Sequence, residues 1–384
     1  MRVGMVVSYL QEEFGGHEFY LCRELSRIGH EVTLYTSNRT RPGYGNKKFI
    51  TKDMDVGFEI KRFHAPFEIS EIPVMQGLGK TLMSDKLDLI HAHEFFQFCS
   101  LTACRVAQKR RIPFILTQHG YGGLPLKKSI WLPFVLYKKT FGGYVLQKAD
   151  MIITLTQAAK RALVSDGISE KKIVVIPTGV QTDLYKPSNP SLFPDYGISD
   201  EEKVILFVGR LVENKGVHIL LRAFYAVQKK VSDVRLVIVG GGNLEGYLHS
   251  LAQRLGIEKK VLFLGKIPQE KMPYIYSGAD VFVLPTLYSE PFGIAAIEAL
   301  SSGIPVIASN IGGLKEIVCN NEVGYLVNPG DSIMLEKFLI RLLLNDNERN
   351  RLARNARQKA LEKFSWEKIG RKVSELYQRT AETK

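Results

Sequence analysis

The chain has 384 residues, of which 45% are hydrophobic and 24% charged, and this ordinary globular composition favours two domains. Its formal net charge of +13 is uneven: residues 1–186 carry 26 Lys and Arg against 17 Asp and Glu, whereas residues 187–384 carry 26 against 22. A basic first half favours an anionic partner such as a phosphorylated lipid or an anionic membrane surface. Nucleic acid is not an expected partner, since the sequence has no helix-turn-helix, zinc-finger or aromatic RNA-binding signature.

The opening stretch "MRVGMVVSYL" has too short an apolar run for a secretory signal and predicts a buried strand. Other apolar runs, such as 130–137, are far shorter than the ~20 residues of a membrane-spanning helix. The cysteines show neither CxxC pairing nor metal-ligand spacing (Cys22, Cys99, Cys104 and Cys319). We therefore expect free thiols in a cytoplasmic protein.

Short, β-branched apolar runs alternate with helical stretches along the first half of the chain. The expected strands lie in 2–10, 30–36, 87–94, 113–120, 149–156 and 172–179, and 16–29 is one of the helical stretches. This alternation predicts a parallel sheet with helices on both faces.

The alternation restarts after a Pro-rich piece at 185–197, which we interpret as a linker. The second series of expected strands lies in 203–211, 234–242, 260–267, 280–286 and 305–309. We therefore predict an α/β protein with two Rossmann-like domains, 1–186 and 187–364. A helix interrupted at "FSW" follows, and we expect its last part, 365–384, to cross back onto the first domain. Ligands of such sheets bind at the carboxyl ends of the strands, so the cleft between the domains is the expected site.

Two glutamates, Glu290 and Glu298, stand eight positions apart in "SEPFGIAAIEAL". A helix that begins near Phe292 would separate them by up to ~12 Å, which is about the span from a nucleotide's ribose to the sugar beyond its diphosphate. The backbone amides of Phe292, Gly293 and Ile294 would then face the diphosphate. Taken alone, the pair is more simply explained as one solvated and one helix-stabilising glutamate.

Two cations, Arg210 and Lys215, follow an expected strand in "GRLVENKG". At the carboxyl end of a strand they suit a diphosphate leaving group, although a surface pair beside a helix start is the alternative. Gly240 and Gly241, in "VGGGN", end the next strand and allow either close approach to a ligand or a tight turn. No P-loop or dinucleotide fingerprint is present.

In the first half, Gly15 and Gly16 open a helix after the first strand, which is a geometry that suits phosphate. His119, in "LTQHGYGG", ends a strand and is expected in the cleft. A zinc site formed by His91, His93 and His119 is an alternative. Packing and strand termination explain His91 and His93 more simply, and we expect no metal.

Together these motifs resemble the family 4 glycosyltransferases, which are retaining enzymes of the GT-B architecture. The resemblance runs from "GGHEFYLCRELSRIGHEVTLYT" through "HAHE", "TQHG", "IPTGV", "GRLVENKG", "SGADVFVLPTLYSEPFGIAAIEALSSGIPVIAS" and "IGGLKEIV" to "GYLVNPGD". It implies that the second domain holds a nucleotide-diphosphate sugar and the first domain the acceptor.

By this resemblance Arg210 and Lys215 grip the diphosphate, Glu290 contacts the donor sugar and Glu298 the ribose. Gly16 approaches the phosphates, His119 lies beside the reacting sugar, and Gly312 and Gly313 give room near the donor. The implied reaction is metal-independent transfer of a hexose or N-acetylhexosamine, on the same face of the sugar, from a UDP- or GDP-linked donor. No cofactor is implied.

The expected acceptor is a hydroxyl compound, either a glycan or a lipid-linked acceptor, and the sequence does not decide between them. Stretch 125–148 mixes lysines with aromatic residues. It either packs on its own sheet or lies on an anionic membrane. In the second case the protein would be peripheral to the inner face of the membrane. A nucleotide-sugar 2-epimerase of the same fold and a non-catalytic nucleotide-sugar binder remain as alternatives.

Overall fold

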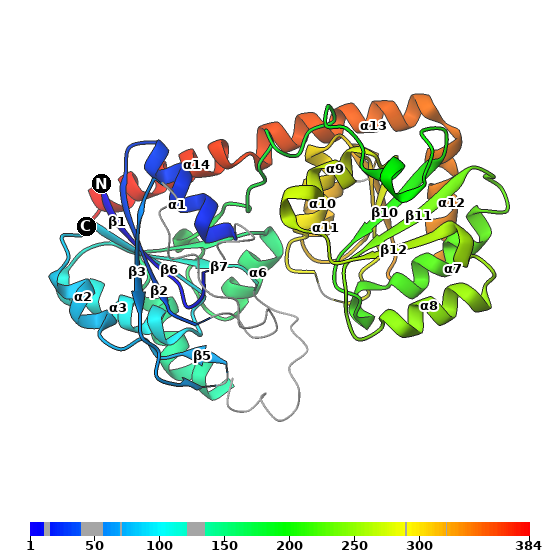
Figure 1. The fold of residues 1–384 in the computed structure, drawn as a ribbon. Coiled ribbons are helices and arrows are strands. Elements are labelled where there is room, and N and C mark those ends of the chain that lie inside the picture. Colours follow the sequence, from blue (N-terminus) through cyan, green and yellow to red (C-terminus); the bar gives the residue numbers. More distant parts are fainter. Residues whose placement is uncertain (11–15, 40–56, 70, 121–134, 289, 320) are drawn as a thin grey trace. The chain divides into compact units, whose positions relative to one another are not determined.

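The computed structural model describes residues 1–10, 16–39, 57–69, 71–120, 135–288, 290–319 and 321–384 (Figure 1). They form two compact units, the first comprising Met1–Gly179 and Trp366–Lys384 and the second Val180–Ser365. Each unit is an α/β layer structure built on a parallel sheet, as the alternating pattern predicts.

The first unit contains a seven-stranded parallel sheet in the order β3-β2-β1-β6-β7-β8-β9. Its strands are β1 (Arg2–Val6), β2 (Glu31–Ser37), β3 (Glu59–Phe63), β6 (Leu89–His93), β7 (Phe114–Gln118), β8 (Met151–Thr154) and β9 (Ile173–Val175), and a small antiparallel pair joins β4 (Glu68–Ile69) and β5 (Ile72–Pro73). Its helical segments are α1 (His17–Arg27), α2 (Leu78–Ser84), α3 (Phe98–Arg110), η1 (Lys138–Gly142), α5 (Gly143–Lys148), α6 (Gln157–Ser165), η2 (Glu170–Lys172) and α14 (Trp366–Glu382).

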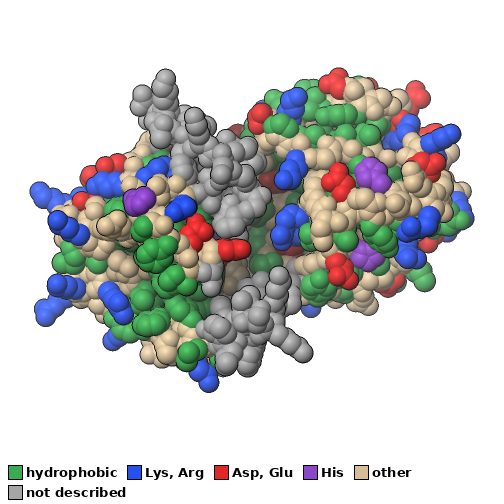
Figure 2. Space-filling view, turned by 60° about the horizontal axis from the view of Figure 1, so that its bottom comes forward, with side chains coloured by type: hydrophobic (Ala, Val, Ile, Leu, Met, Phe, Trp, Pro, Cys, Tyr) green, Lys and Arg blue, Asp and Glu red, His purple; other side chains and the backbone are tan. Residues whose placement is uncertain are grey.

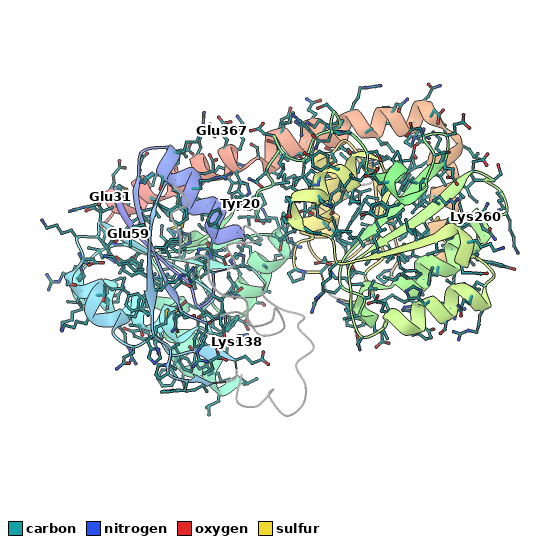
Figure 3. All side chains as sticks on the ribbon, viewed as in Figure 1. Tyr20, Glu31, Glu59, Lys138, Lys260 and Glu367 are labelled. Carbon is teal, nitrogen blue, oxygen red and sulfur yellow. The ribbon has the colours of Figure 1, made fainter. Side chains whose placement is uncertain are left out.

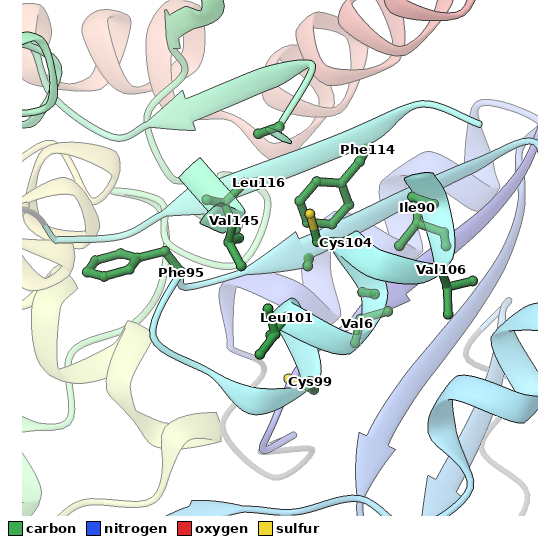
Figure 4. Packing of buried hydrophobic residues seen from close by; sticks show 14 of the residues in the cluster. Val6, Ile90, Phe95, Cys99, Leu101, Cys104, Val106, Phe114, Leu116 and Val145 are labelled. Carbon is green, nitrogen blue, oxygen red and sulfur yellow. The ribbon is translucent and has the colours of Figure 1, made fainter. Parts of the chain in front are cut away.

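Strand side chains alternate between two apolar layers of this sheet. Val3 and Met5 of β1 pack with α1 and α14 on one face, where the red helix α14 lies beside the blue helix α1 (Figure 1). Val6 packs on the other face with residues of α2, α3 and α5, including Cys99, Leu101 and Val145 (Figure 4). Both faces are buried, so the strands read as continuous apolar runs.

The second unit contains a six-stranded parallel sheet in the order β12-β11-β10-β13-β14-β15. Its strands are β10 (Lys203–Val208), β11 (Val234–Val239), β12 (Val261–Gly265), β13 (Val281–Leu284), β14 (Val306–Ser309) and β15 (Gly324–Val327). Its helical segments are η3 (Phe193–Tyr196), η4 (Glu213–Lys215), α7 (Val217–Val227), α8 (Glu245–Arg254), η5 (Glu258–Lys260), η6 (Gln269–Lys271), α9 (Met272–Ser277), α10 (Ile294–Ser301), α11 (Leu314–Val318), α12 (Ser332–Leu344), α13 (Asp346–Lys359) and η7 (Ala360–Phe364).

The units meet in sequence a few residues before the boundary expected at 186/187. Arg357 Nη1 donates to the carbonyl oxygens of Thr182 and Tyr185 at 3.0 and 2.9 Å. Ser301 Oγ also donates to the Tyr185 carbonyl, at 2.6 Å. These bonds hold the segment after Val180 on the second unit, so that the Pro-rich piece belongs to that unit.

Two edge strands and one helix start differ from the sequence-based expectations. β3 and β15 were not expected: β3 ("EIKRF") is half-exposed and charged, and β15 ("GYLV") begins with glycine, a residue that strands disfavour. Helix α10 begins at Ile294 rather than near Phe292, since Gly293 at its N-cap has a left-handed backbone. Within the described ranges, no helix has the length and apolarity needed to cross a membrane.

Candidate functional site

The strand order of each sheet reverses between two neighbouring strands, β1 and β6 in the first unit and β10 and β13 in the second. In open parallel sheets, ligands bind beyond the carboxyl ends of the strands at such a reversal. The loops after β10 and β13 carry Arg210, Lys215 and Glu290, and Gly16 and Glu94 lie beyond β1 and β6. Each unit therefore presents sequence-predicted site residues at its own reversal point.

Lys215 and Glu290 form an ion pair that joins the loops after β10 and β13. Lys215 Nζ donates to Glu290 Oε2, and the two side chains are only 17% and 10% exposed. Thr286 Oγ1 donates to the same oxygen at 3.4 Å. The backbone N–H of Leu287 donates to the carbonyl oxygen of Asn214 at 2.7 Å, so main-chain bonding also joins the loops. The fold thus brings the sequence-predicted cation and carboxylate together.

Two glycines allow the close backbone approach that places this pair. Gly216 has φ +66°, and a Cβ there would lie 2.0 Å from the carbonyl oxygen of Pro285. Gly312 has φ +49°, and a Cβ there would lie 2.2 Å from the carbonyl oxygen of Glu290. Gly313 N–H donates to that same carbonyl oxygen at 3.1 Å. Gly312 and Gly313 therefore fix the backbone of Glu290, whatever ligand they also face.

The other residues that the sequence predicts for the second-unit site differ in exposure and in backbone bonding. Arg210 is exposed, and no carboxylate in the described part of the chain lies within ion-pair distance of it. Phe292 is buried and Ile294 exposed at the start of α10. Gly240 and Gly241 join neighbouring loops, since Gly240 N–H donates to Gly265 O at 2.7 Å and Leu211 N–H donates to Gly241 O at 3.0 Å.

Glu298 lies within α10 in a network of phenols and an amide. Its Oε2 accepts from the Tyr276 hydroxyl at 2.8 Å, and Gln269 Nε2 donates to the Tyr185 hydroxyl at 2.6 Å. Burial raises the pKa of Glu298 to about 7, although hydrogen bonds from Tyr276, Tyr185 and Gln269 oppose the shift. A buried carboxyl group with a raised pKa is a candidate functional residue.

Imidazoles gather at the reversal point of the first unit. His93 Nδ1 lies 2.9 Å from His119 Nε2, and the carboxylate of Glu18 lies 3.2 Å from that same His119 nitrogen. His17, next to Gly16 at the start of α1, stands edge-on to His119 with ring centroids 4.6 Å apart. His91 does not join the group, because its Nδ1 lies 2.6 Å from Tyr377 Oη and its Nε2 lies 2.7 Å from Thr117 Oγ1.

Glu94 also lies at this reversal point and was not singled out from the sequence. It has φ +65°, a conformation that a residue with a Cβ seldom adopts. Gln118 Nε2 donates to its carboxylate, and burial raises its pKa to about 7 despite the opposing influence of His119 and Gln118. Its position directly after "HAH", at the end of an expected strand, was the sequence feature that could have identified it.

Other neighbours of the predicted residues were also missed. His17 and Glu18 follow the glycine pair at the helix start, and Tyr276 and Gln269 lie far from Glu298 in sequence, so only the fold brings them together. Gly15, which the sequence predicts as a donor contact, lies outside the described residues. Gly16 is the N-cap of α1.

The raised pKa of Glu298 predicts a pH-dependent stability. Its proton is held more tightly in the folded state than in the unfolded chain, so this group lowers the free energy of unfolding as pH rises from about 4.5 to about 7. We expect Glu298→Gln to reduce the loss of stability between pH 5 and pH 8 by on the order of 2 kcal/mol. Urea unfolding at both pH values measures this.

The matched control is Glu270→Gln, because Glu270 is an exposed glutamate of the same unit. It should leave the pH dependence unchanged. Identical pH dependence in wild type and Glu298→Gln would contradict the assignment.

Comparison with known proteins gives a glycosyltransferase family model for each half of the chain. The model "Glycosyltransferase Family 4" matches residues 17–184 and "Glycosyl transferases group 1" matches 188–359. A D-inositol 3-phosphate glycosyltransferase of Corynebacterium urealyticum is 35% identical, covering 98% of this chain and 95% of the relative. A phosphatidyl-myo-inositol mannosyltransferase of Mycobacterium leprae is 32% identical, covering 99% and 97%.

Among solved structures, HepE of Anabaena in complex with UDP superposes with a TM-score of 0.79. The superposition covers 99% of this chain and 100% of that one, at 23% sequence identity, and supports the fold. The chain therefore belongs to the group 1 glycosyltransferases, and it is a transferase enzyme with the GT-B fold.

Proposed function

We propose that the enzyme transfers a hexosyl or N-acetylhexosaminyl group from a UDP- or GDP-linked donor to a hydroxyl acceptor, with retention at the anomeric carbon and without a metal. The observation that carries this proposal is the ion pair of Lys215 and Glu290 at the reversal point of the second sheet. It lies in the loops where a parallel sheet binds its ligand, and it includes a cation suited to phosphate.

Lys215 and Arg210 would compensate the charge of the diphosphate. The exposed guanidinium of Arg210 has no carboxylate partner among the described residues, and the Lys215 ammonium is held by Glu290. When the donor breaks, negative charge grows on the leaving diphosphate, and fixed cations stabilise that charge at little cost in reorganisation. Two cations of the chain would thus do the work that a metal ion does in other transferases.

The two carboxylates would bind hydroxyl groups on either side of the diphosphate. Glu290 keeps Oε1 as an acceptor for a hydroxyl of the donor sugar while Oε2 holds Lys215. Glu298 is assigned to the ribose, where two vicinal hydroxyls would donate to it. Binding would favour its ionised form, because hydrogen bonds to a carboxylate stabilise the charge.

In the proposed reaction, the bond between the anomeric carbon and the diphosphate oxygen breaks with its electron pair on the oxygen. The acceptor oxygen attacks the anomeric carbon from the same face, and its proton passes to the leaving phosphate. His119 is assigned to the reacting sugar by the family resemblance alone. No covalent enzyme intermediate is needed.

For the acceptor we propose a glycan or a lipid-linked hydroxyl compound. The two relatives compared above are named for inositol phosphate and phosphatidylinositol substrates, so the acceptor panel begins with phosphorylated polyols and their lipid-linked forms. The Anabaena structure holds UDP, which places UDP-linked donors first in the donor panel.

Part of the first unit supports a proposed contact with an anionic membrane. Leu136, Phe141 and Tyr144, around η1 and α5, are 64%, 49% and 37% exposed. Lys139 and Lys148 are exposed in the same segment, and Lys138, labelled in Figure 3, is paired with Asp166. Figure 2 shows hydrophobic side chains between basic ones on this unit. An apolar and basic surface of this kind binds anionic lipid. The rest of the predicted segment, 125–134, lies outside the described residues.

The donor assignment is tested by calorimetric titration with UDP, GDP and ADP, each with EDTA and with Mg²⁺. We expect one nucleotide to bind equally well under both conditions, and Glu298→Ala to weaken it by about tenfold or more, since a hydrogen bond to a charged group contributes about 1.5–3 kcal/mol. Failure of every nucleotide to bind would refute the proposal. Donor binding without turnover on the acceptor panel would indicate a binder, and a 2-epimerised sugar product would indicate an epimerase.

The membrane contact is tested by flotation with vesicles of phosphatidylglycerol and with vesicles of phosphatidylcholine alone. We expect the protein to float with the anionic vesicles only, and Leu136→Ser/Phe141→Ser to remain in the dense fraction. Ile333→Ser, which changes an exposed apolar residue of the second unit, is the matched control and should float like wild type. Wild-type protein that stays unbound, or a double variant that still floats, would contradict this assignment.

A further inference from the structure

The imidazole cluster of the first unit has the ligand set of a transition-metal site. One ring nitrogen from each of His17, His93 and His119 lies within 4.8 Å of the other two. Glu18 Oε1 lies 3.2 Å from His119 Nε2 and 3.7 Å from His93 Nδ1, so a carboxylate flanks two of the three rings. Three imidazoles form a set that Zn²⁺ accepts, with a fourth position for water or a carboxylate.

Neighbouring groups direct one nitrogen of each buried ring toward the cluster. His17 Nδ1 bonds Thr178 Oγ1 at 2.8 Å, which leaves Nε2 as its ligand atom. His93 Nε2 lies 3.1 Å from Met5 Sδ, which leaves Nδ1 beside His119. Metal-binding histidines have such outer partners, which fix the ring orientation and the tautomer. His91 is not a ligand of this cluster, because both of its ring nitrogens are hydrogen-bonded to hydroxyl groups.

Three segments distant in sequence supply these ligands. His17 and Glu18 are the first two residues of α1, His93 ends β6, and His119 directly follows β7. The carboxylate of Glu18 offsets one of the two charges of a bound ion. The alternative to a bound ion is a hydrogen bond, in which one proton lies between His93 Nδ1 and His119 Nε2.

We propose that His17, His93 and His119, with Glu18 beside them, bind one divalent transition-metal ion, with Zn²⁺ as the ion that fits the ligand set best. The ion would fasten the start of α1 to the ends of β6 and β7. It would not take part in the transfer reaction. Because His119 is also assigned to the reacting sugar, a bound ion would inhibit transfer, and this one consequence rests on the proposed function.

The test is metal titration of the chelator-treated full chain. Co²⁺, which substitutes for Zn²⁺ and absorbs visible light in four-coordinate sites, should bind with one equivalent per chain and be displaced by Zn²⁺. Thr178→Val, which removes only the outer partner of His17, should weaken Zn²⁺ binding by about 10–100-fold, and His17→Ala should weaken it further. Circular dichroism checks the fold of each variant.

The control is His249→Ala, because His249 is an exposed histidine of the second unit. It should bind Co²⁺ and Zn²⁺ like wild type. The proposal is overturned if Co²⁺ gives no four-coordinate spectrum, or if folded Thr178→Val and His17→Ala bind Zn²⁺ as tightly as wild type. Stoichiometric binding without inhibition of transfer would leave the metal site standing and refute only the contact of His119 with the sugar.

Discussion

The ion pair between Lys215 and Glu290 is the contact on which the candidate donor site depends. It joins the loops after β10 and β13 at the point where the strand order of the second sheet reverses. Pairs removed from water in this way contribute little net stability, because desolvation offsets much of their attraction. The surrounding backbone nevertheless holds both partners, through Asn214 on one loop and through Gly313 on Glu290 itself. Backbone bonds that hold two charges in place are better explained as preorganisation for a charged ligand than as a source of stability.

The two units use the same architectural position for different chemistry. At the reversal point of the second sheet lie charged groups, namely the exposed Arg210, the paired Lys215 and Glu290, and then Glu298 with its titrating carboxyl. At that of the first sheet lie three imidazoles beside one carboxylate, Glu18. Burial opposes the ionisation of Glu18, but its interaction with His119 outweighs burial and lowers its pKa to about 2. The charged groups of the second unit suit an anion, and the imidazoles and carboxylate of the first unit suit a metal ion or a sugar hydroxyl.

Much of the fold followed from the sequence because parallel strands buried on both faces leave long apolar runs. β3 and β15 were missed because β3 is half-exposed and charged and β15 begins with glycine, so neither shows a long β-branched apolar run. The charged residues assigned to the donor, Arg210, Lys215, Glu290 and Glu298, could be named from local motifs, and their contact with a donor stays a prediction. Their partners could not be named in this way, because Tyr276 reaches Glu298 and Thr178 reaches His17 only through the tertiary fold. The alternative zinc set of the sequence included His91, whose hydroxyl partners no local pattern reveals.

The most direct test of the account asks whether Lys215 recognises the diphosphate. It compares the affinities of the nucleoside diphosphate that binds and of its parent nucleoside, in wild type and in Lys215→Met/Glu290→Gln, a double variant that leaves no uncompensated buried charge. We predict that the double variant weakens the nucleoside diphosphate by about tenfold or more and leaves the nucleoside unchanged. Equal effects on both ligands, or none on either, would contradict the assignment of this ion pair to the donor diphosphate.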